Sequence, residues 1–264
     1  MYDFAYHKPA SVADAVKLLG ADGDAKAMAG GQTLIPTLKQ RLARPSAVVD
    51  LSAIKDLTGI SVSGGKVTIG AMTRHVDVAS SADVKKALPA LAALADGIGD
   101  PQVRNRGTIG GSIANNDPAA DYPAACLALG ATIKTDKREI PADEFFKGMF
   151  ETALKPGELI VSVSFPVAEK AAYMKFGQPA SRYALVGVFV AKGPAGARVA
   201  VTGAAAAVFR WKEAEAALAK SWSASAIEGL KVQASGLNGD IHAGPEYRAH
   251  LIGVMAKRAL AAAG

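Results

Sequence analysis

Cysteine and histidine are scarce in this sequence, with one cysteine, Cys126, and four histidines among 264 residues. A single cysteine excludes an internal disulfide and any iron–sulfur cluster or multi-cysteine metal site held by this chain alone. His242 and His250 have no cysteine, aspartate or glutamate grouped with them at metal-ligand spacing, and His75 suits a polar position in a loop or at a helix start. We therefore expect no metal site, and no Ser-His-Asp or Cys-His arrangement assigns a catalytic residue.

The sequence also lacks long apolar runs and runs of like charge. No stretch approaches the length that spans a bilayer, and the first residues, Met1 to Phe4, are not typical of a signal peptide, so the expected location is the cytoplasm. Lysine and arginine number 30 against 24 aspartates and glutamates, but they are scattered, which disfavours nucleic-acid binding. This modest excess suits anionic small molecules or an acidic partner.

What the sequence does contain is an alternation of strand and helix patterns. Leu34, Leu38 and Leu42, for example, recur at spacings of four, which is typical of one face of a helix. The composition shifts near residue 170, so we expect a larger α+β unit before that point and a smaller one after it. The patterns predict helices at 11–19, 33–42, 88–97, 212–219 and 246–260, and strands at 25–29, 48–51, 67–69, 131–134, 159–165, 183–191 and 198–205.

The first stretch that could bind a ligand is AGGQTLIPTLKQRL, residues 29–42. A predicted strand ends in Gly30 and Gly31, and a predicted helix begins within two or three residues. Glycines let the backbone approach a ligand, and the N–H groups at a helix start lack partners, so this turn suits a phosphate. An ordinary tight turn explains the same residues. Rossmann and P-loop folds are unsupported, because no P-loop motif is present and Pro101 breaks the glycine pattern that begins at Gly97.

The second stretch is NRGTIGGSIANNDPAADYPAA, residues 105–125, which is polar and rich in glycine. Structureless loops of this length are uncommon unless they bind something. The hydroxyl, amide and carboxylate groups suit ribose or ribityl hydroxyls, and the N–H groups suit phosphate oxygens. A solvated turn with side-chain to backbone bonds is the alternative. Two such stretches in one chain favour a nucleotide cofactor that lies between them.

Three motifs resemble a known family: AGGQTLIPTLKQRL (29–42), IGAMTRH (69–75) and IGDPQVRNRGTIGGSIANNDPAADYP (98–123). They closely resemble the FAD-binding medium subunit of the molybdenum hydroxylases, which include carbon monoxide, xanthine and bacterial aldehyde dehydrogenases. The likeness continues through GELIVSVSFP (157–166) to DIHAGPEYRAHLIGVMAKRAL (240–260) and so covers essentially the whole chain.

The resemblance implies a fold and its boundaries. It predicts a two-lobed α+β FAD-binding domain of the vanillyl-alcohol-oxidase (PCMH) type at 1–170, with lobes at about 1–55 and 56–170. A smaller α+β C-terminal domain of the CO dehydrogenase flavoprotein type is expected at 171–264.

The resemblance also implies a site for non-covalently bound FAD. The pyrophosphate falls on the N–H groups of Gly30 to Leu34. Asp121 matches a carboxylate near FAD, and Lys175 matches a lysine that approaches the flavin. Tyr183 is a looser match, and a role as a strand residue of the C-terminal core explains it equally well. The expected FAD-binding residues are Ala29, Gly30, Gly31, Gln32, Thr33, Leu34, Ile35, Ile98, Thr108, Gly110, Gly111, Ser112, Asn115, Asp121, Ile160, Lys175 and Tyr183.

In function, the resemblance implies an oxidoreductase subunit within an electron path. Family members work beside a large subunit with a molybdenum–pterin cofactor and a small subunit with two [2Fe-2S] clusters, as a heterotrimer or its dimer. Electrons pass from substrate at molybdenum through the clusters to FAD, and then to NAD⁺, a quinone, oxygen or another acceptor. The sequence names neither the substrate nor that acceptor.

Two alternatives remain open at this point. A stand-alone flavin oxidase or reductase of the same fold would need its own acid–base group, and many such proteins tether FAD through a histidine or cysteine in the first lobe. Residues 29–42 contain neither residue type. A scaffold that has lost FAD is the second alternative, although both glycine-rich stretches are intact.

Overall fold

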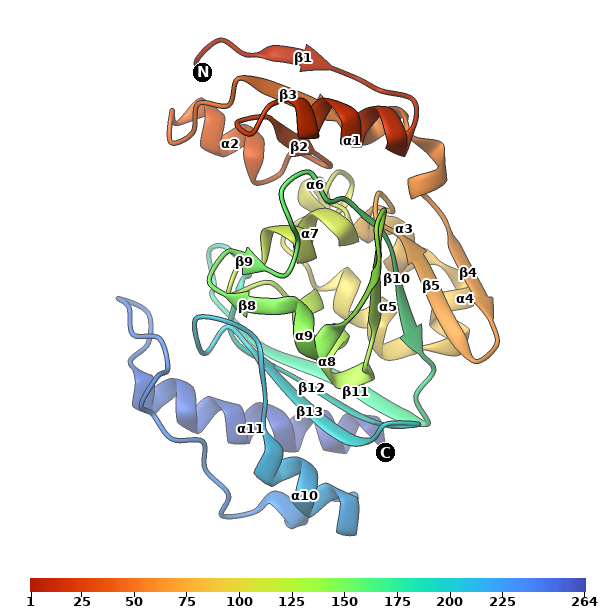
Figure 1. Cartoon of the computed structure of the whole chain (residues 1–264). Helices are drawn as coiled ribbons and strands as arrows, with labels where there is room; N and C mark the ends of the chain where they lie inside the picture. Colours follow the sequence, from red (N-terminus) through yellow and green to blue (C-terminus); the bar gives the residue numbers. More distant parts are fainter.

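The chain folds into three layers that follow one another in sequence order. The computed structural model describes residues 1–264, and Figure 1 shows the N-terminal lobe at one end, a middle lobe, and a C-terminal sheet with its helices at the other end. No helix combines the length and the apolar character that crossing a membrane requires.

The N-terminal lobe is a small parallel sheet with strand order β1-β3-β2. The side chain of Ser11 caps α1 by accepting a hydrogen bond from the Asp14 N–H. The predicted helix at 33–42 is shorter than expected, because the chain leaves it at Arg41, which has a φ of 59°, and Leu42 is exposed. The elements are β1 (Ala5–His7), α1 (Val12–Ala21), β2 (Lys26–Met28), α2 (Leu34–Lys39) and β3 (Ala47–Asp50), followed by two 3₁₀ turns (Leu51–Ala53 and Lys55–Leu57).

The middle lobe is built on an antiparallel sheet with strand order β4-β5-β10-β6-β7. Its strands are β4 (Ile60–Ser63), β5 (Lys66–Gly70), β6 (Thr132–Thr135), β7 (Glu139–Pro141), β8 (Phe146–Gly148), β9 (Glu151–Thr152) and β10 (Ile160–Pro166), of which β8 and β9 form a separate hairpin. Its helices are α3 (His75–Ser80), α4 (Ala82–Ala87), α5 (Pro89–Asp96), α6 (Pro101–Arg104), α7 (Ile109–Asn115), α8 (Tyr122–Leu129) and α9 (Ala142–Phe145).

The polar stretch at 105–125 is not one long loop, which corrects the sequence-based expectation. Thr108 caps α7 by accepting a hydrogen bond from the Gly111 N–H, and Asn116 ends that helix in the left-handed conformation. Helix α8 then begins with a proline in its first turn, and all eight of its residues are buried. Composition alone suggested a loop, but local caps and tertiary burial make two helices of it.

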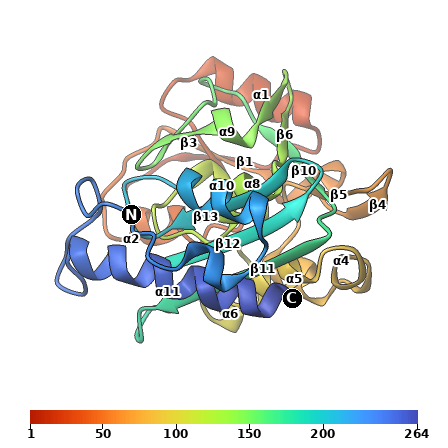
Figure 2. The same cartoon turned by 90° about the horizontal axis from the view of Figure 1, so that it is seen from below.

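The C-terminal unit is an antiparallel sheet with strand order β11-β12-β13-β14. Figures 1 and 2 show α11 and α10 on one face of this sheet, and α8 packs against the other. Val188 and Val190 of β12 belong to the core with α11, whereas Phe189 and Ala191 belong to the core of the middle lobe. The elements are β11 (Lys170–Gly177), β12 (Ala184–Gly193), β13 (Gly196–Thr202), β14 (Phe209–Arg210), α10 (Lys212–Lys220) and α11 (Pro245–Ala263), with a 3₁₀ turn at Ala224–Ile227.

Candidate functional site

The turn between β2 and α2 presents a row of unpaired backbone N–H groups. The five consecutive N–H groups from Gly30 to Leu34 donate no hydrogen bond to the protein, and Thr33 does not cap the helix with its side chain. The first paired N–H is that of Ile35, which donates to the Gly31 oxygen at 3.0 Å. Gly31 has a φ of 74°, a conformation that favours glycine. Unpaired N–H groups that converge at a helix start can bind an anion such as a pyrophosphate.

The two stretches predicted to hold one cofactor touch each other. A Cβ at Gly30 would overlap the Arg106 carbonyl, and a Cβ at Gly111 would lie 3.3 Å from that of Ala29. Gly110 packs as closely on the end of β5, where a Cβ would lie 2.6 Å from the Ala71 oxygen. These glycines therefore let three backbone segments pack closely together. The sequence analysis explained the glycines only by the close approach of a ligand.

The N–H groups of the second stretch differ from those of the first, because most already have acceptors. The Gly110 N–H donates to the Ala71 oxygen at 2.8 Å, and the Ser112 N–H to the Thr108 oxygen at 3.0 Å. The Gly111 N–H donates to Thr108 Oγ1 at 3.1 Å. The half-buried side chains of Ser112 and Asn115 are then the polar groups of α7 best placed for a ligand. The prediction of phosphate-binding N–H groups therefore has more unpaired donors to draw on in the first stretch than in the second.

Asp121 lies at the start of α8 and is almost completely buried. Its Oδ1 accepts a hydrogen bond from the Tyr173 hydroxyl at 2.5 Å, and its Oδ2 accepts one from Lys175 Nζ at 3.1 Å. Lys175 Nζ also donates to the Gly97 oxygen at 2.7 Å. Burial raises the pKa of Asp121, while the Lys175 charge and the two hydrogen bonds oppose that rise. These contacts bring two predicted residues together, Asp121 from the middle lobe and Lys175 from the C-terminal sheet.

A polar cavity of about 410 Å³ opens beside Lys175. No hydrophobic side chain lines it, and its three cationic side chains face one carboxylate, that of Asp96. Arg104 is held in place by donating to the Ile98 oxygen at 3.1 Å. Ile98, predicted to line the cofactor, therefore borders this cavity with its backbone carbonyl, which accepts the hydrogen bond from the lining residue Arg104. The lining is Asp96, Gly97, Gly99, Arg104, Lys175, Gly177, Gln178, Pro179 and Arg182.

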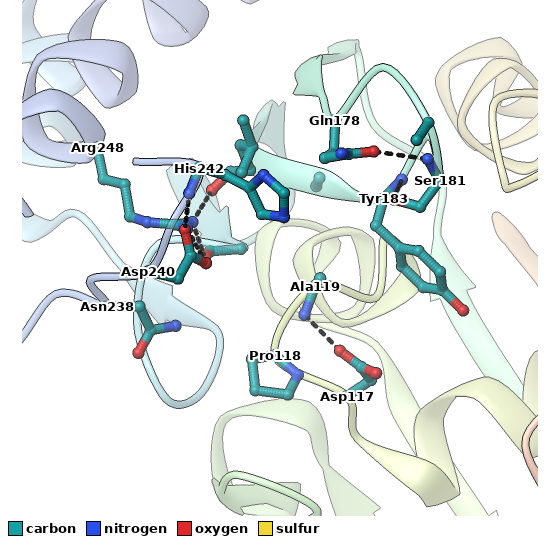
Figure 3. Close-up of a pocket in the computed structure, with 14 residues that line it drawn as sticks. Asp117, Pro118, Ala119, Gln178, Ser181, Tyr183, Asn238, Asp240, His242 and Arg248 are labelled. Carbon is teal, nitrogen blue, oxygen red and sulfur yellow. Dashed lines mark hydrogen bonds and ion pairs between the residues drawn. The ribbon is translucent and has the colours of Figure 1, made fainter. Parts of the chain in front are cut away.

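A second cavity, of about 360 Å³, lies between the α7–α8 connection, the β11–β12 turn and the segment before α11 (Figure 3). Tyr183, a predicted residue, lines it together with Asp117, and burial and the charges of Asp117 and Asp121 raise the pKa of Tyr183. In Figure 3 the His242 ring lies between the Asp240–Arg248 pair and the segment from Gln178 to Tyr183. Arg248 Nη2 donates to Asp240 Oδ2 at 2.6 Å, which fixes one wall of this cavity.

Two residues highlighted by the sequence are more deeply buried than their patterns indicated. Ile160 is 6% exposed and packs within the middle-lobe core, so it offers a ligand little surface. His75 is the first residue of α3, and burial together with the Arg104 charge lowers its pKa to about 4, so the imidazole is neutral at physiological pH. No group of three or more His, Cys, Asp or Glu side chains that could hold a metal ion includes His75.

Sequence reasoning missed Tyr173, Arg104 and Arg182, which belong to the same region as Lys175. Tyr173 precedes Lys175 by two residues on one strand, and this spacing places both on the same face of β11. That signal was present in the sequence, but the strand itself was not predicted. Arg104 and Arg182 come from a short helix and a turn, and their patterns predict no common location.

Comparison with known proteins extends over the whole chain. The model of the family described as "FAD binding domain in molybdopterin dehydrogenase" matches residues 2–168. The carbon monoxide dehydrogenase medium chain of Hydrogenophaga pseudoflava is 38% identical over 98% of this chain and 96% of its own length. The nicotine 6-hydroxylase medium subunit of Paenarthrobacter nicotinovorans is 36% identical over the same shares.

Solved structures agree with this likeness. The structure of quinoline 2-oxidoreductase from Pseudomonas putida 86 includes a chain that superposes with a TM-score of 0.89 at 32% identity, covering 99% of this chain and 97% of that one. A chain of carbon monoxide dehydrogenase from Hydrogenophaga pseudoflava superposes with a TM-score of 0.88 at 37% identity, with the same coverage.

Proposed function

Because the chain belongs to the family of FAD-binding domains of molybdopterin dehydrogenases, we propose that it is the FAD-carrying electron-transfer subunit of a molybdenum-containing dehydrogenase. It takes electrons from the [2Fe-2S] clusters of a small partner subunit and passes them to an external acceptor. A large partner subunit with a molybdenum–pterin cofactor oxidises the substrate. The relatives' own names, medium chain and medium subunit, support a multi-subunit assembly such as a heterotrimer.

One observation carries the cofactor assignment. The N–H groups from Gly30 to Leu34 are unpaired and consecutive, and the second stretch packs against this turn where Gly30 meets the Arg106 carbonyl and Gly111 meets Ala29. A dinucleotide pyrophosphate matches such an array in charge and in hydrogen bonding. We therefore propose that the FAD pyrophosphate binds there, with Ser112 and Asn115 binding polar groups beside it. The two-lobed arrangement fits the vanillyl-alcohol-oxidase type of fold.

The residues around Lys175 fit the other end of the cofactor. Bound FAD would supply the redox chemistry that couples one-electron clusters to an acceptor, while this chain binds it and tunes it. Lys175, held by Asp121 and the Gly97 oxygen, places a positive charge beside the polar cavity. Among the remaining predicted residues, Ile98 borders this cavity through its backbone and Tyr183 lines the second cavity. Ile160 stays a proposed contact of FAD only for the small part of its surface that is exposed.

The electron-path proposal is tested by stopped-flow absorbance at the flavin band. The isolated chain should contain FAD in equimolar amount, released by acid or heat, and should pass electrons to artificial acceptors once its flavin is chemically reduced. With carbon monoxide, a purine or an aldehyde alone, the flavin should stay oxidised. Mixed with a molybdenum subunit and a [2Fe-2S] subunit, substrate should reduce the flavin at a rate that depends on the clusters.

Other outcomes would reject the proposal in different ways. Substrate-driven bleaching by the chain alone would favour a stand-alone flavin oxidase. A chain that retains no FAD after incubation with excess FAD and removal of the unbound cofactor would favour a scaffold. A flavin that stays attached after denaturation would contradict non-covalent binding.

A further inference from the structure

One hydroxyl of the C-terminal sheet reaches across the molecule to a carboxylate of the middle lobe. The Tyr173 hydroxyl donates to Asp121 Oδ1 at 2.5 Å, and the two residues are 52 positions apart in sequence. Lys175, on the same face of β11, contacts the other oxygen of this carboxylate at 3.1 Å. Asp121 is thus clamped between a neutral donor and a cation that belong to one strand.

The neighbouring strand leaves room for this clamp. Gly187 pairs with Lys175 across β11 and β12, and a Cβ at Gly187 would overlap the Tyr173 hydroxyl. The same Cβ would also lie 2.9 Å from Thr202 Cγ2 on β13. A shift of β12 away from Tyr173 would therefore not make room for a side chain at position 187. Phe189, which pairs with Tyr173, stacks on its ring at a centroid distance of 6.1 Å. Both the gap and the stacked ring direct the hydroxyl at Asp121.

The charge of this group depends on whether Asp121 is ionised. The carboxylate is 4% exposed and the Lys175 side chain 15% exposed, so water compensates neither charge well. With Asp121 ionised, the pair has no net charge. With Asp121 protonated, the Lys175 ammonium is uncompensated. A hydrogen bond donated by Tyr173 stabilises the ionised form and therefore keeps the pair neutral.

We propose that Tyr173 is a positioning residue that acts through Asp121 to keep the Lys175 charge compensated, and thereby sets the reduction potential of the bound flavin. This inference rests on the proposed function, which places the flavin beside Lys175. A positive charge near a flavin stabilises its reduced form, so loss of the Tyr173 hydroxyl shifts the midpoint potential in the positive direction.

The test measures the flavin midpoint potential of the full FAD-loaded chain by reductive titration against redox dyes at neutral pH. Tyr173→Phe, which keeps the ring and its stacking, should bind FAD and shift the potential in the positive direction. Asp121→Asn should shift it in the same direction and at least as far. Adding Tyr173→Phe to Asp121→Asn should give no further shift, because a residue that acts only through Asp121 has nothing left to act on.

Two further variants separate this role from a merely structural one. Tyr6→Phe removes a matched tyrosine–aspartate hydrogen bond, the 2.5 Å contact of Tyr6 with Asp50 in the N-terminal lobe, and should leave the potential unchanged. Gly187→Ala keeps Tyr173 but displaces its hydroxyl, and should shift the potential in the same direction as Tyr173→Phe. The thermal unfolding midpoint of each variant reports whether it is folded.

Each remaining outcome counts against the inference. An unchanged potential in folded, flavin-loaded Tyr173→Phe overturns it and leaves the proposed function intact, as does a full additional shift in the double variant. A Tyr173→Phe chain that does not fold makes Tyr173 a structural residue and also overturns it. A wild-type chain that takes up no FAD contradicts the proposed function, and the inference falls with it.

Discussion

At the scale of single residues, Asp121 shows how burial limits what a carboxylate can do. Both of its oxygens already accept hydrogen bonds from the protein, so we expect any support of FAD to act through Lys175 as well as by direct contact. Asp121→Ala should raise the FAD dissociation constant about tenfold to hundredfold, roughly 1.5–3 kcal/mol, the range for bonds to charged groups. Titration of the apo chain with FAD measures this. Asp83→Ala, at an exposed position of α4, is the control. An unchanged FAD titration for Asp121→Ala would mean that Asp121 has only a structural role.

Glu158 predicts how stability depends on pH. Hydrogen bonds from Arg138, the Lys155 N–H and Thr135 lower the pKa of Glu158 to about 2 from its ordinary 4.5. Because the folded-state pKa is the lower one, the stabilisation is present above pH 4.5 and is lost as the pH falls toward 2. Glu158→Gln should therefore have a lower urea midpoint at neutral pH and a shallower decline on acidification. Glu139→Gln, at an exposed position of β7, should follow the wild type, and parallel curves for Glu158→Gln would refute the assignment.

Single-residue signals in the sequence predicted some of these positions and could not predict others. Ser11, the first residue of the helix predicted at 11–19, caps α1, and a cap of this kind depends only on residues within three positions of one another. The contact between Tyr173 and Asp121 depends on a pairing of β11 with β12 that places Gly187 beside the hydroxyl, and no local pattern encodes it. The same holds for Gly30, whose need for glycine comes from Arg106 far along the chain.

At the scale of elements, the starts of α2 and α7 are less alike than their sequences. Glycine pairs mark both starts, Gly30 and Gly31 before α2 and Gly110 and Gly111 in the first turn of α7, yet the N–H groups before α2 are unpaired and those of α7 are mostly paired. Local sequence predicted phosphate-binding N–H groups in both stretches, but only the tertiary contacts decide which N–H groups remain available. The pairing with Ala71 satisfies Gly110, and no comparable partner reaches Gly31.

This difference gives a prediction for glycine substitutions. Gly111→Val should abolish FAD binding while the chain stays folded, because the added side chain would enter the contact between Ala29 and α7 without requiring a positive φ. Gly31→Val should lose both FAD and stability, since its φ of 74° disfavours a branched residue. FAD titration and thermal unfolding together distinguish the two. Gly253→Val in α11, where a Cβ meets nothing within 4 Å, is the control. Normal FAD binding by both variants would mean that the pyrophosphate lies elsewhere.

At the scale of the whole molecule, the boundary expected near residue 170 separates two units that share a core. Phe189, Ala191 and Ala200 of the C-terminal sheet pack in the same cluster as α8. Thr202 Oγ1 donates to the Ala120 oxygen at 2.6 Å, and Arg198 Nη2 donates to Asp143 Oδ1 at the same distance. The domain boundary near residue 170 stays a prediction, but these contacts argue against independent folding of residues 1–170 and 171–264.

Truncation tests that boundary. A chain of residues 1–168, the span matched by the family model, should fail to show a cooperative thermal transition, because removal of the sheet exposes the buried α8. The full chain should unfold in one transition seen equally by far-UV circular dichroism and by tryptophan fluorescence, whose two reporters both lie in the C-terminal unit. A stable, cooperative fragment, or two separate transitions in the full chain, would contradict the shared core.

The complete burial of α8 also has a consequence for the order of events during synthesis. This helix is made midway along the chain, but β12 and β13, which cover it, are made later. Domains normally fold from the N-terminus as they leave the ribosome. Here one face of α8, an alanine-rich apolar helix, must stay uncovered until β12 and β13, which end at Thr202, have emerged. We expect the nascent chain to depend on chaperones in that interval, and FAD to be acquired only after release.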